Sequence, residues 1–186
     1  MASAATHGFV AVVLGKICLP GKKPWSFWVL STASAILPDA DVIGFAFGIN
    51  YASVFGHRGF FHSILFALLW SLLVLALAFP KTPRFSRPWQ VLFLFFFLVA
   101  VSHGVLDAMT NGGLGVAFFS PFDNTRYFLP WRPIEVSPIS ITHFFSEGGA
   151  EVIRTEIIYI WIPLLILLAV ISFGRTRVRR GHSARS

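Results

Sequence analysis

The sequence feature that most constrains this chain is an apolar run from about Trp89 to Met109 that carries two ionisable residues near its end. A run of this length is typical of a helix that crosses a bilayer. His103 and Asp107 are four residues apart, so on a helix they share one face, with about 5 to 6 Å between their Cβ atoms, and can reach a common ion. Ionisable groups inside a membrane helix are costly, and the pair therefore indicates a functional site.

Further apolar runs and the composition predict an all-α membrane protein. Of the 186 residues, 55% are hydrophobic and only 12% are charged, which is unlike a soluble domain. We predict a single polytopic membrane domain over residues 1–186, with about five transmembrane or half-membrane helices. Pro38, Asp39 and Asp41 interrupt the second run, which we expect to break or to re-enter the membrane near its far end. The five runs cover residues 8–19, 25–49, 60–79, 89–109 and 157–173.

Residues 111–156 lack a long apolar run and contain several glycines and prolines. We predict an ordered extramembrane or interfacial segment here. The glycines of the Asn111–Gly115 stretch could bring backbone N–H groups to a phosphate, but their spacing matches no phosphate-binding fingerprint. Glycine after a helix commonly ends it, so we interpret this stretch as a stop signal.

The positive charges flank the apolar runs, which is typical of cytoplasmic loops. They form no patch interleaved with aromatic residues, so we expect no binding of nucleic acid. A five-helix topology puts all three basic segments on the cytoplasmic side, together with the C-terminus, and places residues 50–59 and 111–156 outside. Cys18 is the single cysteine, which excludes an internal disulfide and a cysteine-based zinc site. The basic segments contain Lys22 and Lys23, then Lys81, Arg84 and Arg87, then Arg175, Arg177, Arg179, Arg180 and Arg185.

The same topology carries seven histidine and aspartate residues, types that commonly bind metals, to the outer ends of four helices. Imidazole and carboxylate groups are common ligands of zinc, manganese and iron, and this number is enough for one or two divalent ions, with zinc or manganese favoured. The alternative for each histidine is a hydrogen-bonded position in the core. The candidate ligands are His7, Asp39, Asp41, His57, His62, His103 and Asp107.

The segment from His57 to Ser63 adds an arginine between two of these histidines. His57 and His62 are five residues apart, so we expect His57 to lie on a loop and turn toward His62. Arg58 carries a planar, permanently charged group that suits a phosphate, although a lipid headgroup contact is the alternative. His143 and Glu147 repeat the four-residue spacing in the outer segment and are weaker candidates for a ligand.

Several of these motifs together resemble the YdjM-like family of predicted inner-membrane metal-dependent hydrolases. The resemblance rests on Leu37-Pro-Asp-Ala-Asp41 and His57-Arg-Gly-Phe-Phe-His-Ser63, with Thr6-His7, Ser102-His103, Leu106-Asp107, Thr110 and the stretch from Ser120 to Pro133 in support. It covers nearly the whole chain and departs from the usual pattern at Phe61, where the family often has threonine. The resemblance implies a bacterial inner-membrane hydrolase, and a distant likeness to zinc-dependent phospholipase C enzymes implies a phosphoester substrate.

The leading hypothesis is hydrolysis of a phosphoester on a membrane lipid or lipid-linked substrate, with the site near the periplasmic face. Arg58, Asp41 and Asp107 are the candidate catalytic residues, and Arg58, Arg126 and Arg132 are the candidates for holding substrate charge. The alternative is a membrane metal-binding protein without enzymatic activity, in transport or regulation. Residues 64–69 and 93–101 are almost wholly apolar, which argues for a one-sided site rather than a transport path. The sequence does not determine the oligomeric state.

Overall fold

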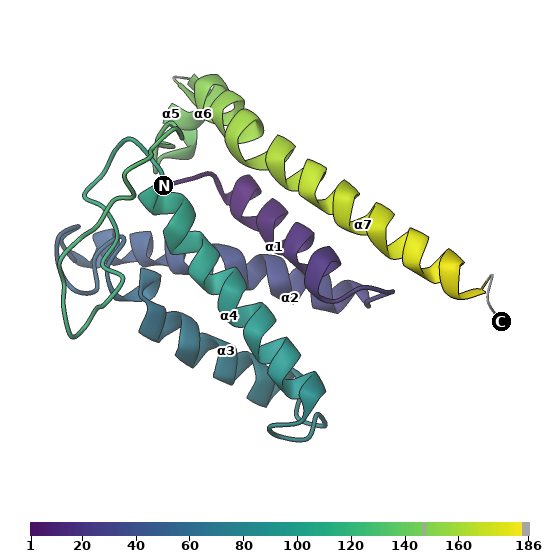
Figure 1. The fold of residues 1–186 in the computed structure, drawn as a ribbon. Coiled ribbons are helices and arrows are strands. Elements are labelled where there is room, and N and C mark those ends of the chain that lie inside the picture. Colours follow the sequence, from purple (N-terminus) through teal and green to yellow (C-terminus); the bar gives the residue numbers. More distant parts are fainter. Residues whose placement is uncertain (147, 184–186) are drawn as a thin grey trace.

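The computed structural model describes residues 1–146 and 148–183 as an assembly of helices (Figure 1). Within these residues the secondary structure is helical apart from two isolated β-bridges, Thr110 with Ile134 and Val116 with Tyr127. The predicted all-α class is therefore confirmed. The α-helices are α1 (Ala4–Cys18), α2 (Trp25–Ile36), α3 (Ile64–Ala78), α4 (Arg87–Ala108), α5 (Ile141–Ser146), α6 (Gly149–Glu156) and α7 (Ile162–Ser183). Three further elements are the 3-10 helices η1 (Leu37–Phe47) and η2 (Phe60–His62) and the π-helix η3 (Ile157–Trp161).

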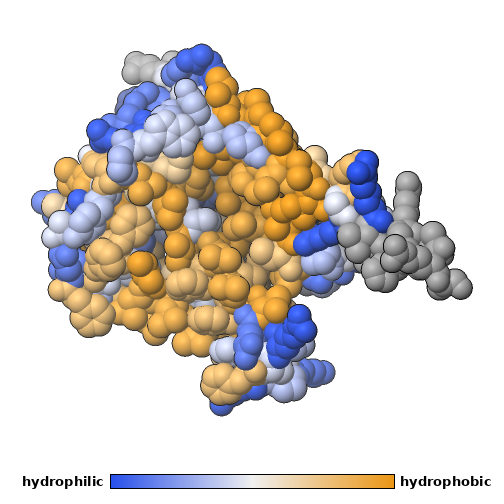
Figure 2. Space-filling view, viewed as in Figure 1, coloured by the Kyte–Doolittle hydropathy of each residue, from blue (hydrophilic) through white to orange (hydrophobic). Residues whose placement is uncertain are grey.

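Three helical segments are long and apolar enough to cross a bilayer, namely Trp25–Phe47, Arg87–Ala108 and Gly149–Arg177. Helices α1 and α3 are apolar but shorter, so the prediction of transmembrane and half-membrane helices is confirmed. The last of the long segments begins at Gly149, earlier than the predicted start at Ile157, because α6, η3 and α7 follow one another without a break. Figure 2 shows hydrophobic residues along the flanks of the helices and hydrophilic residues gathered at the two ends.

Helices α1 to α4 pack side by side, and α7 lies along α1 at one edge (Figure 1). Between α2, α3 and α4 the core contains Phe27, Phe95, Phe96 and Val99. Close approach of membrane helices depends on small residues at the contact, because lipid is as apolar as the helix surfaces. A Cβ atom on Gly15 of α1 would lie 2.7 Å from the ring of Trp28 on α2, so glycine sets this distance.

The basic segments gather at one end of the helices. The connection between α1 and α2, the connection between α3 and α4, and the end of α7 all lie there (Figure 1). Arg175 of α7 donates hydrogen bonds to the carbonyls of Lys16 and Ile17 at the end of α1. The loops that follow η1 and α4 lie at the opposite end. That the basic end faces the cytoplasm stays a prediction.

Two apolar runs are interrupted close to the candidate ligands. Helix α2 ends at Ile36 and continues directly into η1, where Pro38 lies near the start, so the α-helix changes to 3-10 helix at the predicted place but the chain remains helical to Phe47. The third run, residues 60–79, was predicted as a single helix, and this is wrong because η2 and α3 are separate elements. Ser63 has an extended backbone and accepts a hydrogen bond from the N–H of Phe66, so it caps α3 and leaves His62 in the separate turn η2.

Candidate metal centre

His103 and Asp107 lie on one face of α4, as predicted, and both are completely buried. Nδ1 of His103 donates a hydrogen bond of 2.7 Å to the carbonyl of Ala35. Pro38 has no N–H with which to occupy that carbonyl in the 3-10 pattern, so the helix break frees an acceptor for the histidine. Because a neutral imidazole carries one proton, Nε2 of His103 presents its lone pair to the interior of the cluster.

The two aspartates of η1 have different surroundings. They are two residues apart on a helix of about three residues per turn, so they point in different directions. Asp41 accepts a hydrogen bond of 2.7 Å from Nδ1 of His57 and one of 3.2 Å from the N–H of Arg58. Asp39 is 6% exposed, and neither of its oxygens accepts a hydrogen bond from any residue that the structure describes.

The loop that carries His57 and Arg58 folds back onto η1 and α4. Arg58 adopts a left-handed backbone, with φ of 63°, which is uncommon for a residue other than glycine and is found at functional sites. This conformation directs its N–H to Asp41 while its side chain extends to Asp107. The predicted loop position of His57 is confirmed, and its ring centroid lies 5.4 Å from that of His62.

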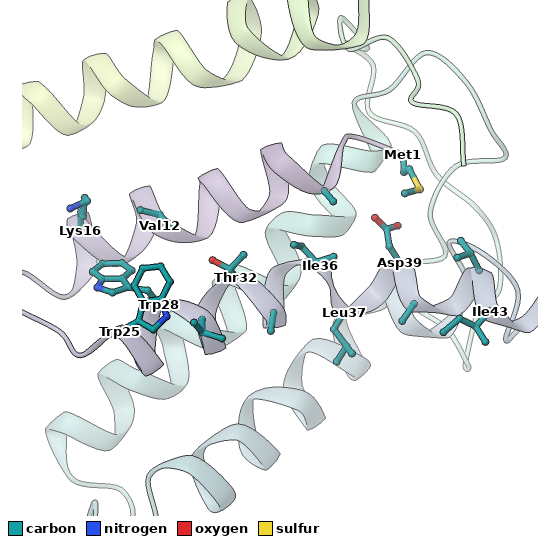
Figure 3. A pocket seen from close by; sticks show the side chains of 15 residues that line it. Met1, Val12, Lys16, Trp25, Trp28, Thr32, Ile36, Leu37, Asp39 and Ile43 are labelled. Carbon is teal, nitrogen blue, oxygen red and sulfur yellow. The ribbon is translucent and has the colours of Figure 1, made fainter. Parts of the chain in front are cut away.

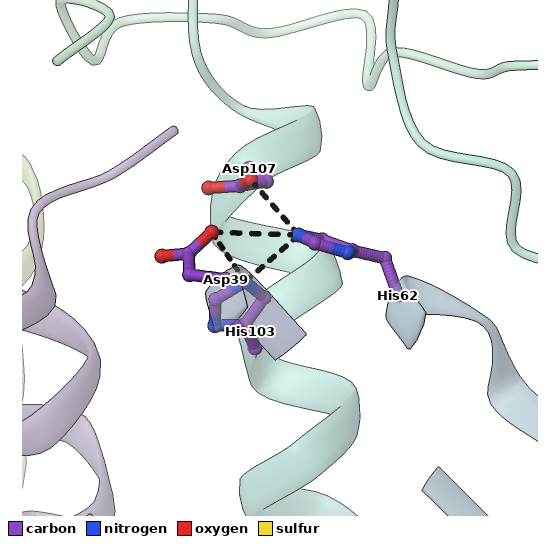
Figure 4. Close-up of side chains that lie close together, drawn as sticks. All are labelled: Asp39, His62, His103 and Asp107. Atoms are coloured by element: carbon purple, nitrogen blue, oxygen red, sulfur yellow. Dashed lines mark hydrogen bonds and ion pairs between the residues drawn. The ribbon is translucent and has the colours of Figure 1, made fainter. Parts of the chain in front are cut away.

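His62 lies between the two aspartates of η1. Its Nε2 is 3.0 Å from Nε2 of His103 and 3.6 Å from both Oδ1 of Asp39 and Oδ2 of Asp107 (Figure 4). Its Nδ1 is 3.2 Å from Oδ2 of Asp41, without the alignment of a hydrogen bond. η2 can pack this closely against α4 because residue 104 is glycine. A Cβ atom there would lie only 3.0 Å from the carbonyl oxygen of His62.

The side chains form two adjoining groups that share His62 and could each hold an ion. The first contains Asp39, His62, His103 and Asp107, and the second contains Asp41, His57 and His62. In each group the potential ligand atoms lie within 4.8 Å of one another, and all members are buried. In the second group Asp41 accepts a hydrogen bond from His57. In the first, Nε2 of His62 and Nε2 of His103 contact each other and face the carboxylate of Asp39, which accepts no hydrogen bond from the described residues. That pattern fits a cation, since a buried carboxylate without a partner is strongly disfavoured.

His7 lies beside the first group. Its ring stacks on that of His103 with 3.8 Å between centroids, and its Nε2 is 3.6 Å from Oδ1 of Asp107. Neither ring nitrogen makes a hydrogen bond within the described residues. Asp107 is better satisfied, because its Oδ1 accepts from the N–H of Ala2 at 2.7 Å and its Oδ2 accepts from Nε of Arg58 at 3.1 Å.

The guanidinium of Arg58 is completely buried and is held by protein groups. Besides the bond to Asp107, it donates to the hydroxyl of Thr110 at 3.0 Å and to the carbonyl of Gly112 at 2.8 Å. Gly113 has a φ of 86°, and a Cβ atom there would lie 2.7 Å from Nη1 of Arg58. Gly113 therefore allows the backbone after α4 to cover this arginine, whereas the helix itself ends at Ala108, before the glycines.

The remaining candidates lie outside the cluster. Arg126 donates to the carbonyls of His57 and Tyr51 at 2.8 and 2.9 Å and so supports the ligand-bearing loop, and burial lowers its pKa. Arg132 is exposed and lies over the ring of Phe128 at 4.6 Å. His143 is exposed on α5, and Glu147 lies outside the described residues.

A buried carboxylate that the sequence motifs did not indicate lies near the cluster. Glu156, at the end of α6, is completely buried and accepts hydrogen bonds from the N–H and the hydroxyl of Ser3 and from the hydroxyl of Thr6. Nε1 of Trp161 in turn donates to Thr6 at 2.7 Å. The π-helix that follows Glu156 is a possible signal, because such turns often occur at functional positions.

The fold and the buried cluster define the chain as a helical membrane protein with a candidate metal centre near one end of its helices. Residues 1–180 match the model of a family described as YdjM inner membrane protein, and the chain belongs to this family. A similar relative is the inner membrane protein YbcI of Escherichia coli (strain K12), which is 37% identical over 142 residues, or 76% of this chain and 80% of that protein. No solved structure matches the chain. The family and the apolar helices support a location in the inner membrane.

Proposed function

We propose that this protein is a membrane-embedded, metal-dependent hydrolase that acts on a phosphoester of a lipid or lipid-linked substrate. The observation that carries the proposal is the carboxylate of Asp39, which is buried without a hydrogen-bond donor in the described part of the chain and lies 3.4 Å from Nε2 of His103. A divalent cation removes the cost of burying such a charge. The ligands are Asp39, His62, His103 and Asp107.

The geometry favours one ion over two. A neutral imidazole offers one lone pair, so His62 can bind an ion through Nε2 only if its proton is on Nδ1. Nδ1 then faces Asp41, 3.2 Å away, and a small rotation makes this contact a hydrogen bond. His103 uses the backbone carbonyl of Ala35 in the same way. Such outer partners are typical of histidines that bind metal, and they make Asp41 and His57 supports of the site.

The bound ion would supply a Lewis acid that acidifies water and polarises a phosphoryl oxygen. Hydrolysis also needs a group that takes a proton from water and returns it to the alcohol that leaves as the P–O bond breaks. Both oxygens of Asp107 are engaged by Ala2 and Arg58, whereas both nitrogens of His7 are without a hydrogen bond to the residues described. We therefore assign the proton transfer to His7, since histidine is the side chain best suited to it near neutral pH.

Arg58 acts in this proposal by holding Asp107. Its three hydrogen bonds to Asp107, Thr110 and Gly112 fix the guanidinium, and a direct contact with substrate phosphate would have to compete with them. Because the guanidinium holds the carboxylate in one orientation, the oxygens of Asp107 keep a fixed position relative to a bound ion. Arg126 and Arg132 lie farther out and remain the candidates for contact with substrate charge.

The proposal is tested by measuring metal content and hydrolysis on the same preparation. Protein purified without chelator should carry about one divalent ion per chain by elemental analysis. It should hydrolyse a phosphodiester presented in phosphatidylglycerol vesicles, lose this activity after chelation, and regain it with zinc or manganese. Full metal content with no hydrolysis of any phosphoester would overturn the enzymatic proposal.

The second candidate is a metal-binding protein without enzymatic activity. It is favoured by the burial of His62, His103 and Asp107, which are at most 5% exposed, because a structural metal site is closed whereas a catalytic one keeps an open position. Asp39 distinguishes the two candidates. Of the four ligands, Asp39 is the one that lines the pocket between α1 and α2, so the approach to the cluster lies on the side of Asp39.

A further inference from the structure

An apolar groove between α1 and α2 passes Asp39 and continues along η1 to Ile43. Its volume is about 960 Å³, within the range of ligand-binding pockets. Trp28, Thr32 and Ile36 line it along one face of α2, and Val12 and Lys16 line it on α1 (Figure 3). Asp39 is the acidic residue among the lining side chains that the structure describes. The groove therefore brings a long apolar surface next to Asp39 of the candidate metal centre.

The dimensions of the groove suit a chain from one leaflet. From Trp25 to Ile36 the α-helical rise is about 17 Å, and three further residues of 3-10 helix to Asp39 add about 6 Å. Half of the hydrocarbon core is about 15 Å. An alkyl chain that begins near Asp39 can thus run along α2 toward the basic end of the helices and remain within the groove.

The distribution of polarity matches a phospholipid. The two charged lining side chains, Asp39 and Lys16, lie toward opposite ends, and the surface between them is almost wholly apolar. Trp25 is 80% exposed and Ile43 is 61% exposed, so the rim is open to the bilayer and a lipid can enter sideways. An alkyl chain gains little by moving from lipid into an apolar groove. The groove would therefore orient the substrate more than it adds to affinity.

We propose that this groove receives one acyl chain of a glycerophospholipid whose phosphate lies at the metal centre. This inference rests on the proposed function and specifies its substrate class as an intact phospholipid. Binding of the acyl chain in the groove fixes the distance between the phosphate of the lipid and the ligands on η1 and α4. Such fixed placement is effective, because a misplacement of about 1 Å can reduce a rate by about 10²-fold.

The test fills the groove without changing the cluster. Ala33 is exposed and lines the groove, so Ala33→Trp obstructs it, and Ala76→Trp on the exposed face of α3 is the matched control. In Ala33→Trp, hydrolysis of dipalmitoyl phosphatidylglycerol should fall by about 10²-fold, because the phosphate is no longer positioned by the bound acyl chain. Hydrolysis of soluble dibutyryl phosphatidylglycerol should not change. Ala76→Trp should behave as the parent with both substrates, and all three proteins should carry equal metal.

Phospholipid retained through detergent purification, measured by mass spectrometry, provides a readout independent of turnover. The parent and Ala76→Trp should retain phosphatidylglycerol, and Ala33→Trp should lose most of it. If the parent hydrolyses no phosphoester but this difference persists, the enzymatic proposal fails and the groove assignment stands. Equal retention and equal rates in all three proteins would overturn the groove assignment. Conversion of a dimeric parent to a monomer by Ala33→Trp would also overturn it, because a second copy of the chain would then occupy the groove.

Discussion

Two buried carboxylates, Asp39 and Glu156, have opposite hydrogen-bonding environments in this molecule. Glu156 accepts three hydrogen bonds from Ser3 and Thr6, all from neutral groups. Asp39 has none from the part of the chain that the structure describes, and faces two histidine nitrogens instead. A carboxylate saturated by the protein holds helices together, whereas one left without donors is suited to bind a cation.

The N-terminal segment connects the two regions. Ala2 donates to Asp107 in the metal centre, Ser3 and Thr6 donate to Glu156, and His7 stacks on His103. Glu156 thereby fixes α6 and η3 against the start of α1, which in turn places His7. The comparison predicts that changes around Asp39 remove metal binding, while changes around Glu156 reduce stability and leave the ion in place.

The largest effect is expected from the double variant His103→Ala/Asp107→Ala. The variant deletes two of the four ligands from one helix, so the stoichiometric ion should be lost and hydrolysis should fall by about 10³-fold or more, toward background, as electrostatic stabilisation of the transition state disappears. Elemental analysis and the vesicle assay measure both. His143→Ala, on the exposed face of α5, should change neither. Full metal content in the double variant would show that the ion lies elsewhere.

An intermediate effect is expected from Arg58→Ala, because it leaves the buried charge of Asp107 without its cationic partner. Removal of one member of a buried ion pair costs about 3 to 5 kcal/mol, so the thermal unfolding midpoint in detergent should fall clearly. Arg58→Lys should recover part of this loss, since an ammonium cannot make all three hydrogen bonds in the same geometry. Arg132→Ala is the control. A variant as stable as the parent but without turnover would instead indicate that Arg58 contacts the substrate.

The smallest effect is expected from Glu156→Gln, which keeps one acceptor oxygen and turns an amide donor toward the groups of Ser3 and Thr6. One unsatisfied buried polar group costs about 1 to 3 kcal/mol, so stability should fall by that amount. Metal content should equal that of the parent. Glu151→Gln, at an exposed residue paired with Arg154, should be nearly neutral. Loss of the ion in Glu156→Gln would show that the two regions are one functional unit.

The sequence by itself determined the class of the protein and the end of the molecule at which the candidate ligands lie. Apolar runs of spanning length leave few alternatives to helices in a bilayer, since backbone groups must be paired within the segment. The spacing of His103 and Asp107 predicted one helical face, and Pro38 predicted the place where the α-helix α2 ends and η1 begins. These inferences succeed because they depend on neighbours a few residues apart.

Only the tertiary structure decided which of these residues face an ion and which are held by the protein. Asp39 and Asp41 are equivalent in the sequence motif, yet among the described residues the fold gives Asp39 no hydrogen bond and bonds Asp41 to His57 and Arg58. Ser3 and Glu156 are 153 residues apart, and their contact has no local signal. The physical reason is that hydrogen bonds between distant segments depend on how helices pack, and the pattern of neighbouring residues does not contain that information.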